Sequence, residues 1–152
     1  MFTSIAIIGR PNVGKSTLFN KLTKTREAIV SDFPGLTKDR NYGYIKLGSI
    51  KSFIIDTGGI GKDESNLSQN ISDQAWMAAN ECNLILFLVD GSESLTSEDL
   101  DILSNLRKLN KPFITLLNKS DKSSKSEALN DISSKGIKAV SYTHLTLPTK
   151  DS

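Results

Sequence analysis

The segment from Gly9 to Ser16 has the residue types and the spacing of a phosphate-binding loop. It reads Gly-Arg-Pro-Asn-Val-Gly-Lys-Ser, which matches the pattern G-x-x-x-x-G-K-[ST]. The glycines let the backbone wrap a polyphosphate, so that the N–H groups of Val13 to Ser16 point toward it. We expect Lys15 to neutralise the β and γ phosphates and the Ser16 hydroxyl to bind Mg²⁺.

Two further polar motifs follow apolar segments of the chain. The first is Asp56-Thr57-Gly58-Gly59, in which Asp56 is placed to hold Mg²⁺ through a water and the Gly59 N–H to contact a terminal phosphate. The second is Asn118-Lys119-Ser120-Asp121. The Asp121 carboxylate can accept from N1–H and from the exocyclic amine of guanine, a donor pair that adenine lacks. Asn118 meets the O6/N7 edge of the base or ties loops together, and the Lys119 stem covers the ring.

These motifs need elements that bring them together, and the apolar pattern predicts alternating strands and helices. The predicted strands are 3–8, 42–47, 51–55, 84–89 and 112–117, and the predicted helices are 16–22, 71–79, 97–109 and 123–134. Residues 23–41 are predicted to form a long surface loop, and Gly48-Ser49 the turn of a hairpin. This alternation predicts an α/β fold of the P-loop NTPase type, with a doubly wound, mostly parallel sheet and helices on both faces.

Composition limits the alternatives. The chain has 152 residues, 38% of them hydrophobic, and a formal net charge of +2, which fits one globular domain and gives no support to a nucleic-acid site. The apolar runs are too short for a membrane span, and the first residues do not look like a signal peptide. A single cysteine, Cys82, excludes an internal disulfide framework and fits a reducing cytoplasm; we expect it to be buried rather than reactive.

With these motifs in order, the sequence closely resembles the translation-factor-type GTPases and, within them, the first GTP-binding domain of the Der (EngA) family of ribosome-assembly GTPases. The likeness runs from about Thr3 to Asp121 and rests on the segments Gly9 to Asn20, Pro34 to Arg40, Asp56 to Ile60 and Asn118 to Asp121. The doubled glycine followed by isoleucine and the Pro-Gly-x-Thr-x-Asp-Arg segment favour Der over the related Era and MnmE families.

The resemblance implies further roles. Thr37 would complete the Mg²⁺ shell when GTP is bound, and the large ribosomal subunit would be the partner of the intact protein. Many GTPases orient the attacking water with a glutamine directly after the glycine that corresponds to Gly59. This chain has Ile60 at that position. The resemblance therefore implies a K⁺ ion coordinated partly by Asn12; the alternative for Asn12 is an Asx turn that stabilises the loop.

The predicted site gathers these residues. The nucleotide-binding set is Gly9, Asn12, Val13, Gly14, Lys15, Ser16, Thr17, Asp56, Gly59, Asn118, Lys119 and Asp121; the catalytic set is Lys15, Thr37, Gly59 and Asn12; the Mg²⁺ ligands are Ser16, Thr37 and Asp56. Other side chains receive plainer interpretations: Trp76 as half-buried packing, Arg10 and Arg40 as exposed loop charges rather than arginine fingers, and His144 as having no role.

The C-terminal part departs from the family pattern. Residues 140–149 resemble the in-frame translation of a sequencing adapter, so we expect 1–139 to be an incomplete GTP-binding domain and 140–152 a non-native tail. A domain of this type also needs a sixth strand and a last helix, which we expect to be missing. Three alternatives to a GTP-hydrolysing conformational switch stay open: a nucleotide-binding fragment that does not hydrolyse GTP, a related GTPase of the Era or MnmE type, and an adenine-specific ATPase supported by the phosphate loop alone.

Overall fold

The computed structural model describes residues 2–23, 41–47, 49–58, 71–118 and 139–141. Its centre is a six-stranded sheet in the order β2-β3-β1-β4-β5-β6. The strands are β1 (Phe2–Ile8), β2 (Asn41–Leu47), β3 (Ile50–Asp56), β4 (Leu84–Asp90), β5 (Phe113–Asn118) and β6 (Ala139–Ser141). Neighbouring strands run parallel except β2 and β3, which form an antiparallel pair. The mostly parallel sheet and its hairpin agree with the predictions.

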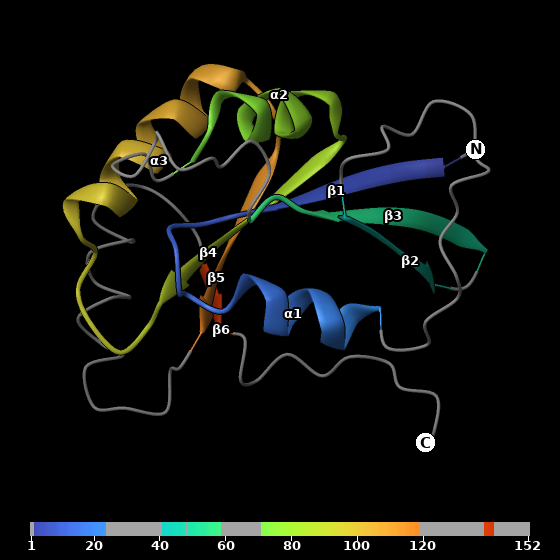
Figure 1. Ribbon diagram of the computed structural model, residues 1–152, viewed down its shortest axis with the longest axis horizontal. Helices are drawn as coiled ribbons and strands as arrows, with labels where there is room; N and C mark the ends of the chain where they lie inside the picture. The colour runs from blue at the N-terminus through green and yellow to red at the C-terminus, as the bar shows by residue number, and fades with distance from the viewer. Residues whose placement is uncertain (1, 24–40, 48, 59–70, 119–138, 142–152) are drawn as a thin grey trace.

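Three helices cover the sheet within the described residues: α1 (Lys15–Leu22), α2 (Asp73–Glu81) and α3 (Ser97–Leu109). Figure 1 shows α2 and α3 together on one face and α1 on the other, which confirms the doubly wound architecture. None of these helices has the length and hydrophobicity that crossing a bilayer requires.

The core has two parts, one on each face. The larger cluster lies on the α2/α3 face and includes Ile85, Phe87, Leu106 and Leu117. The smaller cluster lies on the α1 face, where Ile7, Ile54, Leu88 and Leu116 of the sheet meet Leu18 and Phe19 of the helix and Val13 of the phosphate loop. Strand β4 supplies both clusters because it is central and alternates sides along its length.

The helix ends follow local signals in the sequence. Helix α2 begins after Ser72, whose side chain accepts from the Ala75 N–H, so Ile71 lies before the helix rather than in it. Helix α3 begins with a capping box between Thr96 and Asp99. Among the described residues, no side chain caps α1, which begins after Gly14. A helix start without a side-chain cap is where a ligand can accept from first-turn N–H groups.

At the C-terminal end the structure corrects one expectation. The sheet does not stop before a sixth strand, because β6 pairs in parallel with β5, with Leu116 opposite Val140 and Leu117 opposite Ser141. The strand crosses the predicted boundary between 139 and 140. Of the predicted loop 23–41, Thr23 ends α1 and Asn41 begins β2. Residues 24–40, the predicted helix 123–134 and the rest of the predicted tail lie outside the described residues.

Candidate functional site

The predicted motifs meet at one edge of the sheet. Strands β1, β3, β4 and β5 are parallel, so their carboxyl ends share an edge, and these ends carry the phosphate loop, Asp56 and Asn118. Strand β1 is also the point where the strand order reverses, because it pairs with β3 on one side and β4 on the other. Open α/β sheets bind ligands at such a switch point, outside the carboxyl ends of the strands.

The phosphate loop has two residues with left-handed backbone conformations. Asn12 has φ 69° and Gly14 has φ 107°. A side chain at Gly14 would be strained by this φ, and its Cβ would also lie 2.2 Å from Nδ2 of Asn118. Between them Val13 is fully buried in the core of the α1 face. The loop is thus fixed to the core at Val13 while Asn12 is exposed.

Lys15 is held by the loop that precedes it. Its Nζ donates hydrogen bonds to the carbonyl oxygens of Gly9 at 2.8 Å and of Arg10 at 2.9 Å. These bonds fold the side chain back over the loop and place the ammonium group beside the start of α1, where the helix dipole also favours an anion. The arrangement can bind a phosphate group.

Ser16, in the first turn of α1, and Asp56, the last residue of β3, lie within hydrogen-bond distance of each other. The Ser16 hydroxyl donates to Oδ2 of Asp56 at 3.2 Å, and the Gly58 N–H donates to Oδ1 at 3.0 Å. Asp56 is 4% exposed, so its carboxylate is directed by these bonds rather than by solvent. A hydroxyl beside a carboxylate is a donor set of hard oxygens that suits Mg²⁺, which keeps several waters and takes its other ligands from substrate phosphates.

Asn118 connects the end of β5 to the phosphate loop. Its Nδ2 donates to the carbonyl oxygen of Val13 at 2.7 Å, across 105 residues of sequence. Of the two predicted roles for Asn118, tying loops together is the one that the described residues display. The Lys15–Ser16 and Asn118 motifs are thereby parts of one assembly.

Two side chains at the site were missed or misread from the sequence. Thr57 is 5% exposed, and its hydroxyl donates to the Ile7 carbonyl at 2.7 Å, which anchors the segment after Asp56 to β1. Its only sequence signal is its place directly after the aspartate. Arg10, predicted to be an exposed charge, has a side chain only 15% exposed that pairs with Glu93 at 2.6 Å and Asp99 at 3.2 Å.

The charge of Arg10 is secured by these partners. Burial disfavours the charged guanidinium, but the attraction of Asp99 and the hydrogen bonds to Glu93 and Asp99 outweigh it and raise the pKa of Arg10 above its ordinary value. A group whose pKa is raised on folding contributes stability below the unfolded pKa and loses it only at higher pH. Arginine is charged at physiological pH in any environment, and these carboxylates stabilise that charge in the folded chain.

The other predicted residues are placed as follows. Thr17 is exposed on the first turn of α1. Cys82 is buried at the end of α2, and Trp76 packs half-buried against the core of the α2/α3 face, both as predicted. The positions that lie outside the described residues are Thr37, Arg40, Gly59, Ile60, Lys119, Asp121 and His144.

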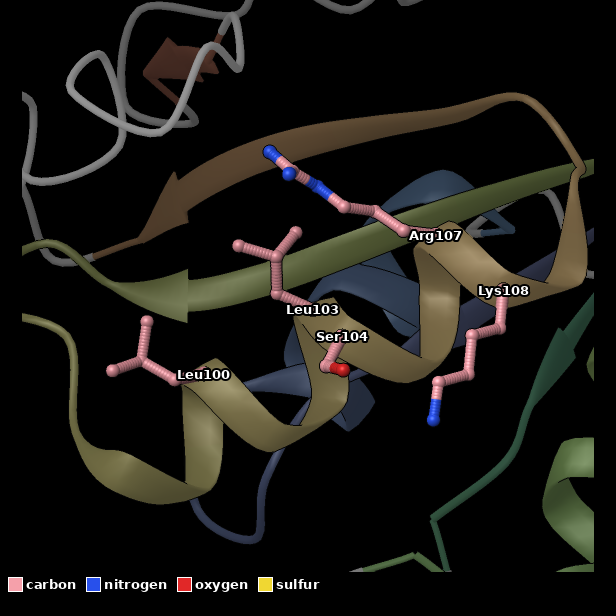
Figure 2. A pocket seen from close by; sticks show the side chains of 5 residues that line it. All are labelled: Leu100, Leu103, Ser104, Arg107 and Lys108. Atoms are coloured by element: carbon pink, nitrogen blue, oxygen red, sulfur yellow. The ribbon is translucent and has the colours of Figure 1, made fainter.

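A separate depression of about 540 Å³ lies along α3. It is lined by Leu100, Leu103, Ser104, Arg107 and Lys108, and Figure 2 shows Leu100, Leu103 and Arg107 directed to one side of the helix and Lys108 to the other. Because none of these lining residues belongs to the phosphate loop, this surface is separate from the site described above.

Comparison with known proteins supplies an independent view of the chain. The model of a family described as 50S ribosome-binding GTPase matches residues 4–119. A curated relative, GTPase Der of Legionella pneumophila (strain Corby), is 49% identical over 147 residues, which cover 95% of this chain and 32% of the relative. The chain thus spans about a third of the length of that relative.

Solved structures give the same fold. Era from Aquifex aeolicus, in a form bound to GDP·AlF4⁻, superposes with a TM-score of 0.71 at 31% identity, covering 92% of this chain and 50% of that one. The G domain of the FeoB iron transporter from T. maritima superposes with a TM-score of 0.64 at 23% identity, covering 93% of this chain and 87% of that one; this second likeness concerns the fold alone.

Proposed function

Because the chain belongs to the family of 50S ribosome-binding GTPases, we propose that it binds GTP with Mg²⁺ and hydrolyses it to GDP and phosphate as a conformational switch. The observation that carries this proposal is the convergence of Lys15, Ser16, Asp56 and Asn118 at one edge of the sheet. Two bonds that join distant motifs, from Ser16 to Asp56 and from Asn118 to Val13, support it.

In this proposal the phosphate loop binds the nucleotide by its main chain. The N–H groups of Val13 to Ser16 donate to the phosphate oxygens, with Gly9 and Thr17 at the two ends of the binding segment. Lys15, already held over the loop by two carbonyl oxygens, supplies a positive charge to the β and γ phosphates. Phosphoryl transfer of this kind depends on positioning and on charge stabilisation rather than on a covalent step.

Ser16 and Asp56, with Thr37 when GTP is bound, would hold Mg²⁺. The metal, when bound, neutralises charge that develops between the β and γ phosphates. The Gly59 N–H would hold the terminal phosphate. The chain has Ile60 where many GTPases use glutamine, so we assign part of the transition-state stabilisation to K⁺ held in part by Asn12, whose exposed side chain on a left-handed residue is free of the core.

Asn118, Lys119 and Asp121 would bind the base, and Asp121 would select guanine. The test is competition for a fluorescent GDP analogue, in which unlabelled GTP should displace the analogue at least a hundredfold better than ATP, a ratio on the order that unpaired polar groups in a specific site produce. Equal displacement by ATP would contradict the guanine assignment and favour the ATPase alternative. Phosphate release with K⁺ or Na⁺ then distinguishes a turning-over enzyme from a fragment that only binds.

Asp121→Asn tests the base contact directly. An amide at this position presents a donor to the donors of guanine, which should weaken GTP binding by about 2 to 3 kcal/mol, whereas xanthine offers an acceptor instead. The variant should therefore prefer xanthosine triphosphate over GTP. Unchanged affinity for GTP would remove Asp121 from the site.

We further propose that the longer protein of which this chain resembles a part associates with the large ribosomal subunit. The family description supports this partner. Sedimentation of the full-length protein with purified 50S subunits, in GTP analogue or GDP, tests it; equal and weak pelleting in both states would contradict a nucleotide-controlled association.

A further inference from the structure

Arg10 is the second residue of the phosphate loop, yet its side chain turns away from the loop toward α3. Its Nε donates to Oδ1 of Asp99 at 3.2 Å, and its Nη2 donates to Oε2 of Glu93 at 2.6 Å. Both partners lie between the end of β4 and the first turn of α3, more than 80 residues along the chain. A guanidinium bound at two of its nitrogens is fixed in orientation as well as in position.

Asp99 is the more informative of the two partners because it is 1% exposed and has two functions. Its Oδ1 accepts from Arg10, while its Oδ2 accepts from the N–H and the hydroxyl of Thr96 as part of the capping box. Each carboxylate oxygen is therefore used, and the start of α3 is fixed by the same side chain that holds Arg10. Glu93 is half-exposed and contributes less, as solvent screens its charge.

The main chain of Arg10 completes the connection. Its carbonyl oxygen is one of the two acceptors that hold Nζ of Lys15. From Asp99 through the guanidinium and backbone of Arg10, a continuous set of bonds runs from the buried start of α3 to the ammonium group of the phosphate loop. Without the side-chain anchor, the carbonyl would be fixed only by the backbone of the loop.

We propose that Arg10, anchored by Asp99 and Glu93, is a positioning residue that holds the carbonyl oxygen which orients Lys15 toward the nucleotide phosphates. It acts through Lys15 and does not itself touch the substrate. This inference rests on the proposed function, since it assigns Arg10 to the same nucleotide site. It also explains why an arginine in the loop is not placed as an arginine finger, because both described contacts of its side chain are to carboxylates on the side of α3.

A double-mutant cycle between Arg10 and Lys15 tests this in the full chain. We expect Arg10→Gln to weaken GDP binding about five- to tenfold, in the range of typical couplings between sites. If Arg10 acts through Lys15, the same substitution in a Lys15→Ala background should cause no further loss. Additive losses in the two backgrounds, or an Arg10→Gln protein that binds like the wild type, would overturn the proposal.

Further variants separate positioning from folding. Arg10→Gln leaves the buried carboxylate of Asp99 without its cation, so the double variant Arg10→Gln with Asp99→Asn removes both charges and should fold while keeping the weaker GDP binding. Normal binding by that folded double variant would contradict a positioning role. Lys108→Gln removes an exposed charge from α3 and should leave GDP affinity unchanged. A wild-type chain that binds no guanine nucleotide would instead reject the proposed function itself.

Discussion

The two faces of the sheet are connected to the phosphate loop in different ways. On the α1 face the connection is hydrophobic, because Val13 of the loop is itself a member of the buried cluster with Leu18 and Leu88. On the α2/α3 face the buried cluster, among the described residues, contains no residue of the phosphate loop, and ion pairs from Arg10 to Asp99 and Glu93 connect this face to the loop. Packing and site positioning therefore share contacts on the α1 face but are separable on the α2/α3 face.

A matched pair of core truncations, one on each face, tests whether packing and site positioning are separable on the α2/α3 face alone. Leu88 and Leu106 are both essentially buried, at 0% and 1% exposure, one on each face. Leu88→Ala and Leu106→Ala should each lower the free energy of unfolding by about 3 kcal/mol, since both leave a cavity. Only Leu88→Ala should also weaken GDP binding, because Leu88 belongs to the cluster that holds Val13 of the phosphate loop.

Urea unfolding followed by fluorescence of the single tryptophan, Trp76, measures the first quantity, and titration of a fluorescent GDP analogue well below the unfolding midpoint measures the second. Equal losses of affinity in the two variants would show that the faces are not separable in this way.

Removal of the Lys15 charge should give a different pattern, a large loss of GDP affinity with little change in the free energy of unfolding. Lys15→Ala deletes two hydrogen bonds to loop carbonyls and the charge that we propose faces the phosphates. We expect GDP binding about a hundredfold weaker, roughly the value of charged hydrogen bonds lost from a site. Lys21→Ala, a loss of the same charge in the last turn of the same helix, is the control and should bind normally. An unfolded Lys15→Ala protein would contradict the expected pattern.

The sequence predicts most of the helices and strands that carry the site, and the reasons can be named. The range Ser97–Leu109 is predicted to the residue from Leu100, Leu103 and Leu106 at helical spacing. In the structure a capping box at Thr96 and a left-handed Asn110 mark its ends. Likewise Asp56 and Asn118 are placed at one edge because parallel strands must end together. Contacts between residues that are distant in the sequence could not be predicted, because they form only on folding.

Arg10 illustrates that failure. The sequence predicts an exposed side chain for an arginine in a polar loop. Its carboxylate partners are more than 80 residues away along the chain, so no local pattern indicates them. Strand β6 is a second case: it has three residues, too few for a periodic signal, and its pairing with β5 is a tertiary contact. The Thr57 bond to β1 is likewise invisible in a motif that predicts only the aspartate and the glycines.

Gly43 tests how closely α1 lies against the sheet at the β2 edge. A Cβ there would lie 2.2 Å from Cγ2 of Thr23 and 3.0 Å from Cζ of Phe19. Gly43→Ala should therefore destabilise the fold by about 2 kcal/mol, a typical cost of overpacking. Adding Thr23→Ser, which deletes Cγ2 but keeps the hydroxyl that donates to Phe19, should recover part of the loss in the same unfolding measurement. No recovery would mean that the strain lies elsewhere.

The smallest expected effect is on the α2/α3 face and has the opposite sign. Thr115 is 1% exposed, and its hydroxyl has no hydrogen-bond partner among the described residues. It shares a strand face with Leu117, two residues along β5, which belongs to the cluster of the α2/α3 face. Because a buried hydroxyl without a partner lowers stability, Thr115→Val should raise the free energy of unfolding by about 1 kcal/mol.

Thr115→Ser is the matched control, since it keeps the hydroxyl and deletes the methyl group, and should lower the free energy of unfolding by about 1 kcal/mol. If the α2/α3 face is separable from the site, neither variant should change GDP affinity. A less stable Thr115→Val would contradict the prediction, because it would mean that the hydroxyl has a partner beyond the described residues. A Thr115→Val protein that is more stable but binds GDP with altered affinity would show that packing along β5 affects the site, through Asn118 at the end of that strand. Packing on the α2/α3 face would then not be separable from the positioning of the site.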